Sequence, residues 1–270
     1  RIKKNTNGLL ILNRNYTDMK IVTLGCSFTE KYPGVDKVWP EIVADSLEAK
    51  LVNYGRSGSG NAYAYSSLVT HILTHGAPDR VYWLLTEYDR MDLHWNRKSL
   101  MSVNYENEPS FLDHFEKMIS SHKDHHLTKT LTQQIKKETK ISKILTKRPT
   151  KYIIDSNFII IHQVQEICKA YNIKLTIMQG LTPLNYDLNH YDVSKFSKLI
   201  ISSEYFSLID KSNIIGYPFM KLLGGFNIMD RLGWYHWHSN YAISKVDPHP
   251  SQVGHNYIAD FFLGNISTLP

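Results

Sequence analysis

The chain has 270 residues, of which 42% are hydrophobic and 21% are charged, a composition that excludes an intrinsically disordered protein and suits one large domain. No apolar run reaches the roughly 18 residues of a membrane span, and two cysteines cannot build the disulfide framework of a small secreted fold. The formal charge of +6 is compatible with a polyanionic partner if the positive side chains are clustered.

Residues 1–18 precede the first predicted strand, and the chain begins with Arg1 instead of a methionine. The apolar stretch at residues 9–12 is too short for the core of a signal peptide, and no small-residue cleavage site follows it. We therefore expect the folded domain to begin at Met19. Residues 1–18 are then either an extension foreign to the native chain or a genuine N-terminal arm. Without an export signal, a cytoplasmic location is expected.

Short apolar, β-rich runs alternate with amphipathic helical patterns along residues 19–270. Strands are predicted at residues 20–24, 51–54, 80–85 and 174–178, and helices at residues 39–47, 62–75, 157–171 and 251–265. Because the strands are almost entirely apolar, they fit a parallel sheet with helices on both faces, which is a three-layer α/β/α fold. Residues 94–151 and 185–243 break this pattern and are predicted to be partly helical insertions in a single domain.

The positive charge is concentrated in the first of these insertions. From Lys117 to Lys151 there are ten Lys or Arg residues and two acidic residues, a net charge of +8. No aromatic side chain is available there for stacking on single-stranded nucleic acid, so a solvated helical insertion is favoured over a polyanion-binding surface. The nearby His122, His125 and His126 have a single acidic neighbour and do not form a typical zinc-site pattern. We expect no metal, no cofactor and no membrane partner.

Ligands of such sheets bind beyond the carboxyl ends of the strands, so the loops after the strands are the informative ones. The first of these loops, GCSFT, presents Ser27 at the end of a buried strand, where a nucleophile would be exposed. A serine hydroxyl needs a base to react near neutral pH. The predicted base is His249, which lies between two prolines just before the last helix. Asp247, two residues earlier, is positioned to fix the tautomer of its imidazole.

Two longer stretches, VDPHPSQVGHNYIAD and WPEIVADSLEAKLVNYGRSGSGNAYA, together with the serine after the first strand, resemble the SGNH (GDSL-like) hydrolase family. The resemblance extends over residues 19–266. It implies a flavodoxin-like parallel sheet and a triad of Ser27, His249 and Asp247. It also implies hydrolysis of an ester through an acyl-serine intermediate, the substrate being an O-acetyl or other acyl ester of a small molecule or a carbohydrate.

The same resemblance assigns an oxyanion hole to the backbone N–H groups of Ser27 and of a glycine after the second strand, where Gly58 is preferred to Gly55. The chain departs from the family after the third strand, where the loop TEYDR contains no asparagine. Asn61 is the nearest substitute for that side-chain donor. Arg90 is another, and its guanidinium also suits an anionic substrate group. A salt-bridged loop of Glu87, Asp89 and Arg90 is nevertheless the favoured interpretation of these residues.

Several residues and functions remain as alternatives. Cys26 is chemically able to act as a nucleophile, although a packed side chain is the simpler interpretation. Trp237, in the aromatic stretch at residues 234–238, is predicted either to stack on a sugar ring or to pack inside the fold. His255 is expected to be a helix or core histidine. An O-acyltransferase with the same triad is one rival function, and a non-catalytic module that retains the fold is the other.

Overall fold

The computed structural model describes residues 19–88, 90–95, 98–103, 150–181, 183, 193–232, 234–245 and 247–266. Within these residues, five parallel strands form a sheet in the order β2-β1-β3-β6-β7. Their bounds are β1 (Lys20–Gly25), β2 (Lys50–Gly55), β3 (Arg80–Leu85), β6 (Lys174–Gln179) and β7 (Ile214–Ile215). Taken in chain order, this is the 2-1-3-4-5 arrangement of flavodoxin-like sheets. The predicted fold class is therefore confirmed.

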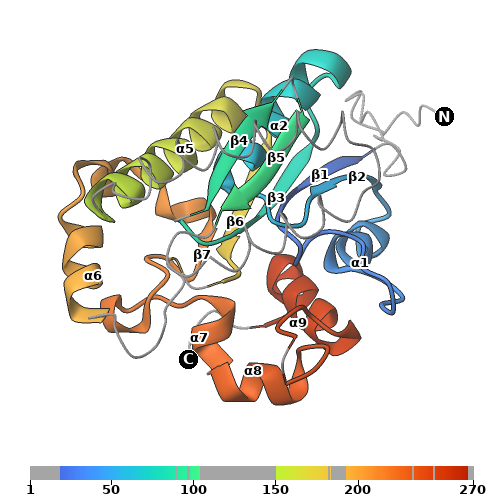
Figure 1. Ribbon diagram of the computed structural model, residues 1–270. Helices are drawn as coiled ribbons and strands as arrows, with labels where there is room; N and C mark the ends of the chain where they lie inside the picture. The colour runs from blue at the N-terminus through green and yellow to red at the C-terminus, as the bar shows by residue number, and fades with distance from the viewer. Residues whose placement is uncertain are drawn as a thin grey trace, which may run out of the picture.

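Helices cover both faces of this sheet, which makes the three layers visible in Figure 1. One face carries α1 (Trp39–Ser46) and α9 (Gln252–Leu263), and the other carries α2 (Asn61–His75) and α5 (Thr150–Ala170). Within the described residues, the remaining helices are α6 (Val193–Ile201), α7 (Ile228–Leu232), α8 (Trp234–Asn240) and three short 3-10 helices, Glu204–Leu208, Lys211–Asn213 and Lys221–Leu223. Among the described helices, none combines the length and the apolar character needed to cross a membrane.

Side chains along each central strand alternate between two buried cores. In β3, Val81, Trp83 and Leu85 face the core beneath α2 and α5, whereas Tyr82 and Leu84 face the core beneath α1 and α9. All five are at most 3% exposed. Burial of one large apolar side chain contributes on the order of 1.5–3 kcal/mol, so both faces stabilise the sheet. This two-sided burial explains why the strands are continuous apolar runs instead of alternating patterns.

The last helix is anchored at its first turn and against the first helix. Ser251 caps α9 as its sequence position suggests, accepting a hydrogen bond from the Gly254 N–H at 3.4 Å. His255 is 1% exposed, and its Nδ1 accepts the backbone N–H of Trp39 at 3.2 Å. Burial lowers the pKa of His255 to about 4, which keeps the ring neutral and able to accept this bond at neutral pH.

Three elements differ from their sequence prediction. Helix α5 begins at Thr150 and not at residue 157, so the helix includes the end of the first predicted insertion. A hairpin of β4 (Met91–Trp95) and β5 (Lys98–Val103) occurs where irregular, partly helical chain is predicted. Strand β7 has two residues, too few to produce a periodic pattern. Residues 1–18 and most of the basic segment at residues 117–151 lie outside the described residues.

The buried His255 predicts a pH-dependent stability. Its folded pKa of about 4 lies below its usual 6.5, so the unfolded chain binds a proton that the folded chain excludes between these values. Stability therefore rises with pH across this window and is lost as the pH falls. From pH 7.5 to 5.0 we expect His255 alone to remove about 2 kcal/mol from the free energy of unfolding, measured by urea titration.

His255→Asn keeps an acceptor near the Nδ1 position but cannot be protonated, so its free energy of unfolding should change less between the two pH values. His236→Asn is the matched control, because His236 is exposed on α8. That variant should show the wild-type pH dependence. An unchanged pH dependence in His255→Asn would contradict the assignment.

Candidate active site

Ser27 lies in a tight turn that leaves the carboxyl end of β1. The turn is closed by hydrogen bonds from the N–H groups of Thr29 and Glu30 to the Cys26 carbonyl, at 2.9 and 3.2 Å. A Cβ at Gly25 would lie 2.1 Å from Thr29 Oγ1, so a glycine is required where the chain folds back. Cys26 is 1% exposed and packs in the core beneath α1 and α9. Its burial favours the packing role over that of a nucleophile.

His249 and Asp247 form a hydrogen-bonded pair in the segment before α9. Asp247 Oδ1 lies 2.6 Å from His249 Nδ1 and accepts the backbone N–H of His249 at 3.0 Å. A carboxylate only accepts hydrogen bonds, so Nδ1 carries a proton, and the neutral form of the ring has its lone pair on Nε2. Partial burial works to raise the pKa of Asp247, but the interactions with His249 and His238 outweigh it and lower that pKa overall. The Asp247 carboxylate therefore orients the His249 ring through Nδ1.

The His249 ring lies against the segment that carries Ser27. Its centroid is 5.7 Å from that of Phe28, the residue after Ser27. It is also stacked on Tyr32, with centroids 5.3 Å apart and an interplanar angle of 10°. Ser27 is 8% exposed, so it is more buried than the sequence predicts, and within the described chain its Oγ makes no hydrogen bond. In enzymes without a bound substrate, the bond between nucleophile and base is often long and tightens on binding.

Trp237 is buried against the turn that carries Ser27 and the segment that carries His249. Its indole N–H donates to the Pro248 carbonyl at 2.9 Å, and its ring stacks on Phe28 with centroids 5.9 Å apart. With 0% exposure, the ring offers no face to a sugar. The structure thus favours the packing alternative over substrate contact, and Trp237 supports the backbone beside His249.

Nearly all backbone N–H groups in the loop after β2 are already hydrogen-bonded. Five of them donate to acceptors within the protein at 2.6–3.2 Å, namely those of Gly55, Arg56, Ser57, Ser59 and Gly60. Among residues 55–60 of the described chain, only the N–H of Gly58 has no hydrogen-bond partner. In the turn after β1, the N–H of Ser27 also has no partner within the described chain. The Gly55 N–H is taken by Asn53 Oδ1 at 2.8 Å, which favours Gly58 of the two glycines as a donor.

Asn61 does not present its amide to a substrate. The residue is 2% exposed, and its Nδ2 donates to Asn157 Oδ1 at 2.9 Å and to the Thr86 carbonyl at 3.4 Å. Its Oδ1 accepts the Thr86 N–H at 3.2 Å. Asn61 therefore joins the start of α2 to the end of β3, and the oxyanion role suggested by its position in the sequence is not supported.

Arg90 forms the salt bridge that was the alternative to a substrate-binding role. Its Nε donates to Glu87 Oε2, and the two side chains are 11% and 10% exposed. Its Nη1 lies 3.5 Å from the Ser59 carbonyl, at the edge of the loop that contains Gly58. Because the charge is compensated by a buried carboxylate, Arg90 is not a free cation for an anionic substrate.

Two carboxylates that sequence reasoning did not connect with this loop contact its backbone. Glu30 accepts the Ser57 N–H at 2.6 Å, and Asp92 in β4 accepts the Gly60 N–H at 2.7 Å. No signal in the sequence indicates the role of Asp92, because it depends on a hairpin packing beside α2. Within the described residues, no group of three or more His, Cys, Asp or Glu side chains could hold a metal ion.

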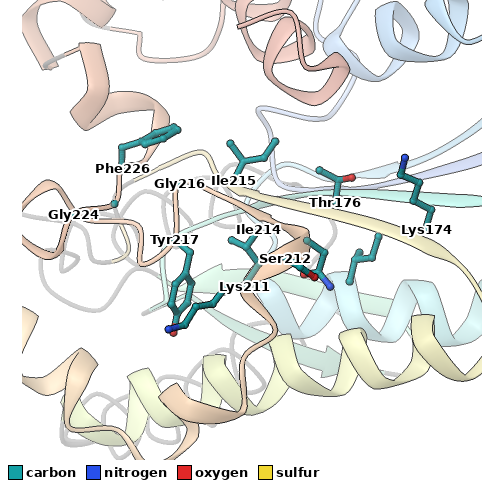
Figure 2. A pocket seen from close by; sticks show the side chains of 13 residues that line it. Lys174, Thr176, Lys211, Ser212, Ile214, Ile215, Gly216, Tyr217, Gly224 and Phe226 are labelled. Atoms are coloured by element: carbon teal, nitrogen blue, oxygen red, sulfur yellow. The ribbon is translucent and has the colours of Figure 1, made fainter. Parts of the chain in front are cut away.

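A cavity of about 500 Å³ lies elsewhere, at the edge of the sheet between β6 and β7 (Figure 2). Among the described residues, Lys174, Thr176, Lys211, Ser212 and Tyr217 line it, but no His, Cys, Asp or Glu does. The Lys211 ammonium lies over the rings of Phe206 and Tyr217, at 5.8 and 5.6 Å, which gives it a structural partner. Within its described lining, this cavity therefore has no histidine to act as a base for a serine hydroxyl.

No protein-family model and no curated protein matches the chain. Among solved structures, the psychrotrophic esterase EstA from Pseudoalteromonas sp. is 13% identical with a TM-score of 0.42, over 92% of this chain and 99% of its own. The acetyl xylan esterase AlAXEase is 13% identical with a TM-score of 0.46, over 92% and 100% of the two chains. A member of the lipolytic protein G-D-S-L family from Veillonella parvula DSM 2008 is 14% identical with a TM-score of 0.45, over 91% and 97%.

The name of the Veillonella parvula structure includes the G-D-S-L family, which is the family that the sequence resembles. At such identities and TM-scores, the similarities carry no argument about chemistry.

The hydrogen bond from the Trp237 indole to the Pro248 carbonyl predicts that Trp237 contributes more to stability than the other buried tryptophans. Trp237→Phe removes volume and leaves the Pro248 carbonyl without its donor. Trp39 and Trp83 are equally buried, but their indole N–H groups have no hydrogen-bond partner within the described chain. We expect Trp237→Phe to lower the free energy of unfolding by about 1 kcal/mol more than Trp39→Phe or Trp83→Phe, measured in urea. Equal losses at the three positions would show that the bond adds no stability.

Proposed function

We propose that this chain is a serine esterase that cleaves an acyl ester with Ser27 as the nucleophile. The observation that carries the proposal is the hydrogen-bonded pair of Asp247 and His249, whose ring packs against the residue after Ser27. The unpartnered N–H groups of Ser27 and Gly58 support it. A nucleophile, a base of defined tautomer and two backbone donors are the groups that acyl transfer requires.

In the proposed acylation step, Ser27 Oγ attacks the ester carbonyl carbon while His249 Nε2 takes the hydroxyl proton. The carbonyl π electrons move to its oxygen, and the resulting oxyanion accepts hydrogen bonds from the N–H groups of Ser27 and Gly58. Asp247 stabilises the imidazolium through Nδ1, where the 2.6 Å contact already exists. The oxyanion then collapses, the bond to the leaving oxygen breaks, and His249 Nε2–H protonates the departing alcohol.

In the proposed deacylation step, His249 takes a proton from water as the water oxygen attacks the acyl-Ser27 carbonyl. Collapse of the second oxyanion breaks the bond to Ser27 Oγ, which recovers its proton from His249. The products are the alcohol and a carboxylic acid. Every proton passes through His249 Nε2, so the chemistry needs no metal or cofactor.

For the substrate, we propose an O-acetyl ester carried by a carbohydrate, on the strength of the family resemblance. Tyr32 supports this choice, because its ring is 36% exposed and stacks on the proposed base, where a sugar can contact it. Acetylated oligosaccharides and p-nitrophenyl esters of increasing chain length would test it, with acetyl esters expected to be hydrolysed fastest. Acylation of an added sugar that outpaces hydrolysis would instead assign the chain to acyl transfer.

Fluorophosphonate labelling tests the nucleophile. We expect the wild-type protein to be labelled at one serine and Ser27→Ala to take no label. His249→Ala should react slower by a factor on the order of 10³ or more, because the hydroxyl loses its base. Intact-mass measurement gives the extent of labelling, and circular dichroism shows that each variant is folded. A folded wild-type protein that takes no label would favour the non-catalytic module, and labelling of Ser27→Ala would move the nucleophile elsewhere.

The tautomer argument makes a separate prediction for Asp247. In Asp247→Ala, His249 Nδ1–H loses its acceptor, so the imidazole proton is no longer held on Nδ1 and the imidazolium loses its negative partner. We expect kcat to fall by a factor on the order of 10⁴ with the fold intact. Steady-state hydrolysis of p-nitrophenyl acetate measures the effect. A decrease of less than about tenfold would show that another group orients His249.

A further inference from the structure

The loop that contains Gly58 is held on both sides by carboxylates from other segments. Before Gly58, Glu30 Oε2 accepts the Ser57 N–H at 2.6 Å. After it, Asp92 Oδ1 accepts the Gly60 N–H at 2.7 Å. Glu30 follows the turn after β1, whereas Asp92 lies in the β4–β5 hairpin. Two parts of the chain distant in sequence therefore fix the residues that flank the proposed oxyanion donor.

Asp92 also serves as an N-cap that comes from outside helix α2. The N-cap position of α2 is Gly60, which has no side chain to satisfy the first turn. Asp92 uses both carboxylate oxygens there, because Oδ2 accepts the Tyr63 N–H at 2.6 Å. A Cβ at Gly60 would lie 2.9 Å from Asp92 Oδ2 and 3.0 Å from the Arg90 carbonyl. The glycine is therefore what allows the carboxylate to approach the helix.

The hydrogen bonds of the flanking residues hold the Gly58 peptide in place. A Cβ at Gly58 would have no heavy atom within 4 Å among the described residues, so no group packs on the side where a side chain would lie. Its φ of +72° lies in the left-handed region that glycine adopts without strain. A glycine- and serine-rich loop has many conformations of similar energy unless its neighbours are fixed. Here Glu30 fixes Ser57 and Asp92 fixes Gly60, while Arg56 and Ser59 are held by main-chain carbonyls of the two loops.

The charges of Glu30 and Asp92 give an independent reason for a geometric role. A negative charge close to an oxyanion raises the energy of the transition state, so neither carboxylate is suited to stabilise the reaction directly. Each one is instead bonded to backbone N–H groups. If only the charge mattered, removing a carboxylate would raise the reaction rate. If the hydrogen bonds to the backbone matter, removing it would lower the rate, so an experiment can separate the two roles.

We propose that Glu30 and Asp92 are positioning residues that orient the Gly58 N–H toward the oxyanion formed at Ser27. This inference rests on the proposed esterase function. It assigns the β4–β5 hairpin, through Asp92, to the construction of the oxyanion hole.

The test depends on how many carboxylate oxygens accept hydrogen bonds in each residue, which is one in Glu30 and two in Asp92. Glu30 accepts through Oε2 alone, so the single carbonyl oxygen of Glu30→Gln can replace it, whereas Glu30→Ala cannot. Asp92 accepts through both oxygens, so Asp92→Asn turns an amide NH₂ toward one N–H and retains one acceptor. We expect Glu30→Gln to react at nearly the wild-type rate. Glu30→Ala, Asp92→Asn and Asp92→Ala should all be slower, with Asp92→Ala the slower of the two Asp92 variants.

The rates to compare are the second-order rate of fluorophosphonate labelling and kcat for p-nitrophenyl acetate. For Glu30→Ala and Asp92→Ala we expect decreases of about 10- to 100-fold. KM should change by less than about threefold, because the oxyanion contact forms in the transition state. Asp210→Asn is the matched control. Asp210 Oδ1 also accepts a backbone N–H, that of Ser212 at 2.9 Å, but it precedes β7 at the edge of the sheet.

Each outcome is decisive for one hypothesis. Wild-type rates in the folded Ala variants, or rates that rise when the charge is removed, would overturn the positioning role. Equal rates for Glu30→Gln and Glu30→Ala would also overturn it for Glu30. If Asp92→Ala does not fold, as judged by circular dichroism, the Glu30 pair and Asp92→Asn still test the proposal. A folded wild-type protein that takes no label would instead refute the esterase function itself.

Discussion

Strand β1 pairs in parallel with β2 on one side and β3 on the other, and the rest of the site depends on this pairing. It sets Gly25 opposite Gly55, so the loops after β1 and β2 leave the sheet side by side. A Cβ at Gly55 would lie 2.4 Å from the Thr29 backbone, which shows that the two loops touch main chain to main chain. The turn with Ser27 and the loop with Gly58 are therefore neighbours, because parallel strands end at one edge of the sheet.

The C-terminal segment reaches this edge because the last helix packs on the first. Gln252 exchanges two hydrogen bonds with the backbone of Lys37, at 2.9 and 3.0 Å, and His255 accepts the N–H of Trp39. These contacts position the start of α9 beside the segment between β1 and α1, and His249 lies three residues before that helix. Without this docking, the pair of Asp247 and His249 would form locally but would not lie beside the segment that carries Ser27.

Most of the regular structure was predictable because each element has its own local pattern. The strands at residues 20–24, 51–54, 80–85 and 174–178 were found within one residue of their predicted ends, since long apolar runs are strong signals. Strand β7 and the β4–β5 hairpin were not predicted. Two residues cannot display a period, and a hairpin is formed by pairing between strands and not by the pattern of either one.

The sequence by itself determined the fold class, the serine after the first strand and the histidine–aspartate pair before the last helix. These features are local: burial patterns set the strands, and two residues separate Asp247 from His249. Only the tertiary structure decided the partners of the other polar side chains. Asn61 bonds across to Thr86, Arg90 pairs with Glu87, and Asp92 caps a helix from a separate hairpin. A hydrogen-bond partner is a matter of distance and direction in space, and spacing along the chain does not encode it.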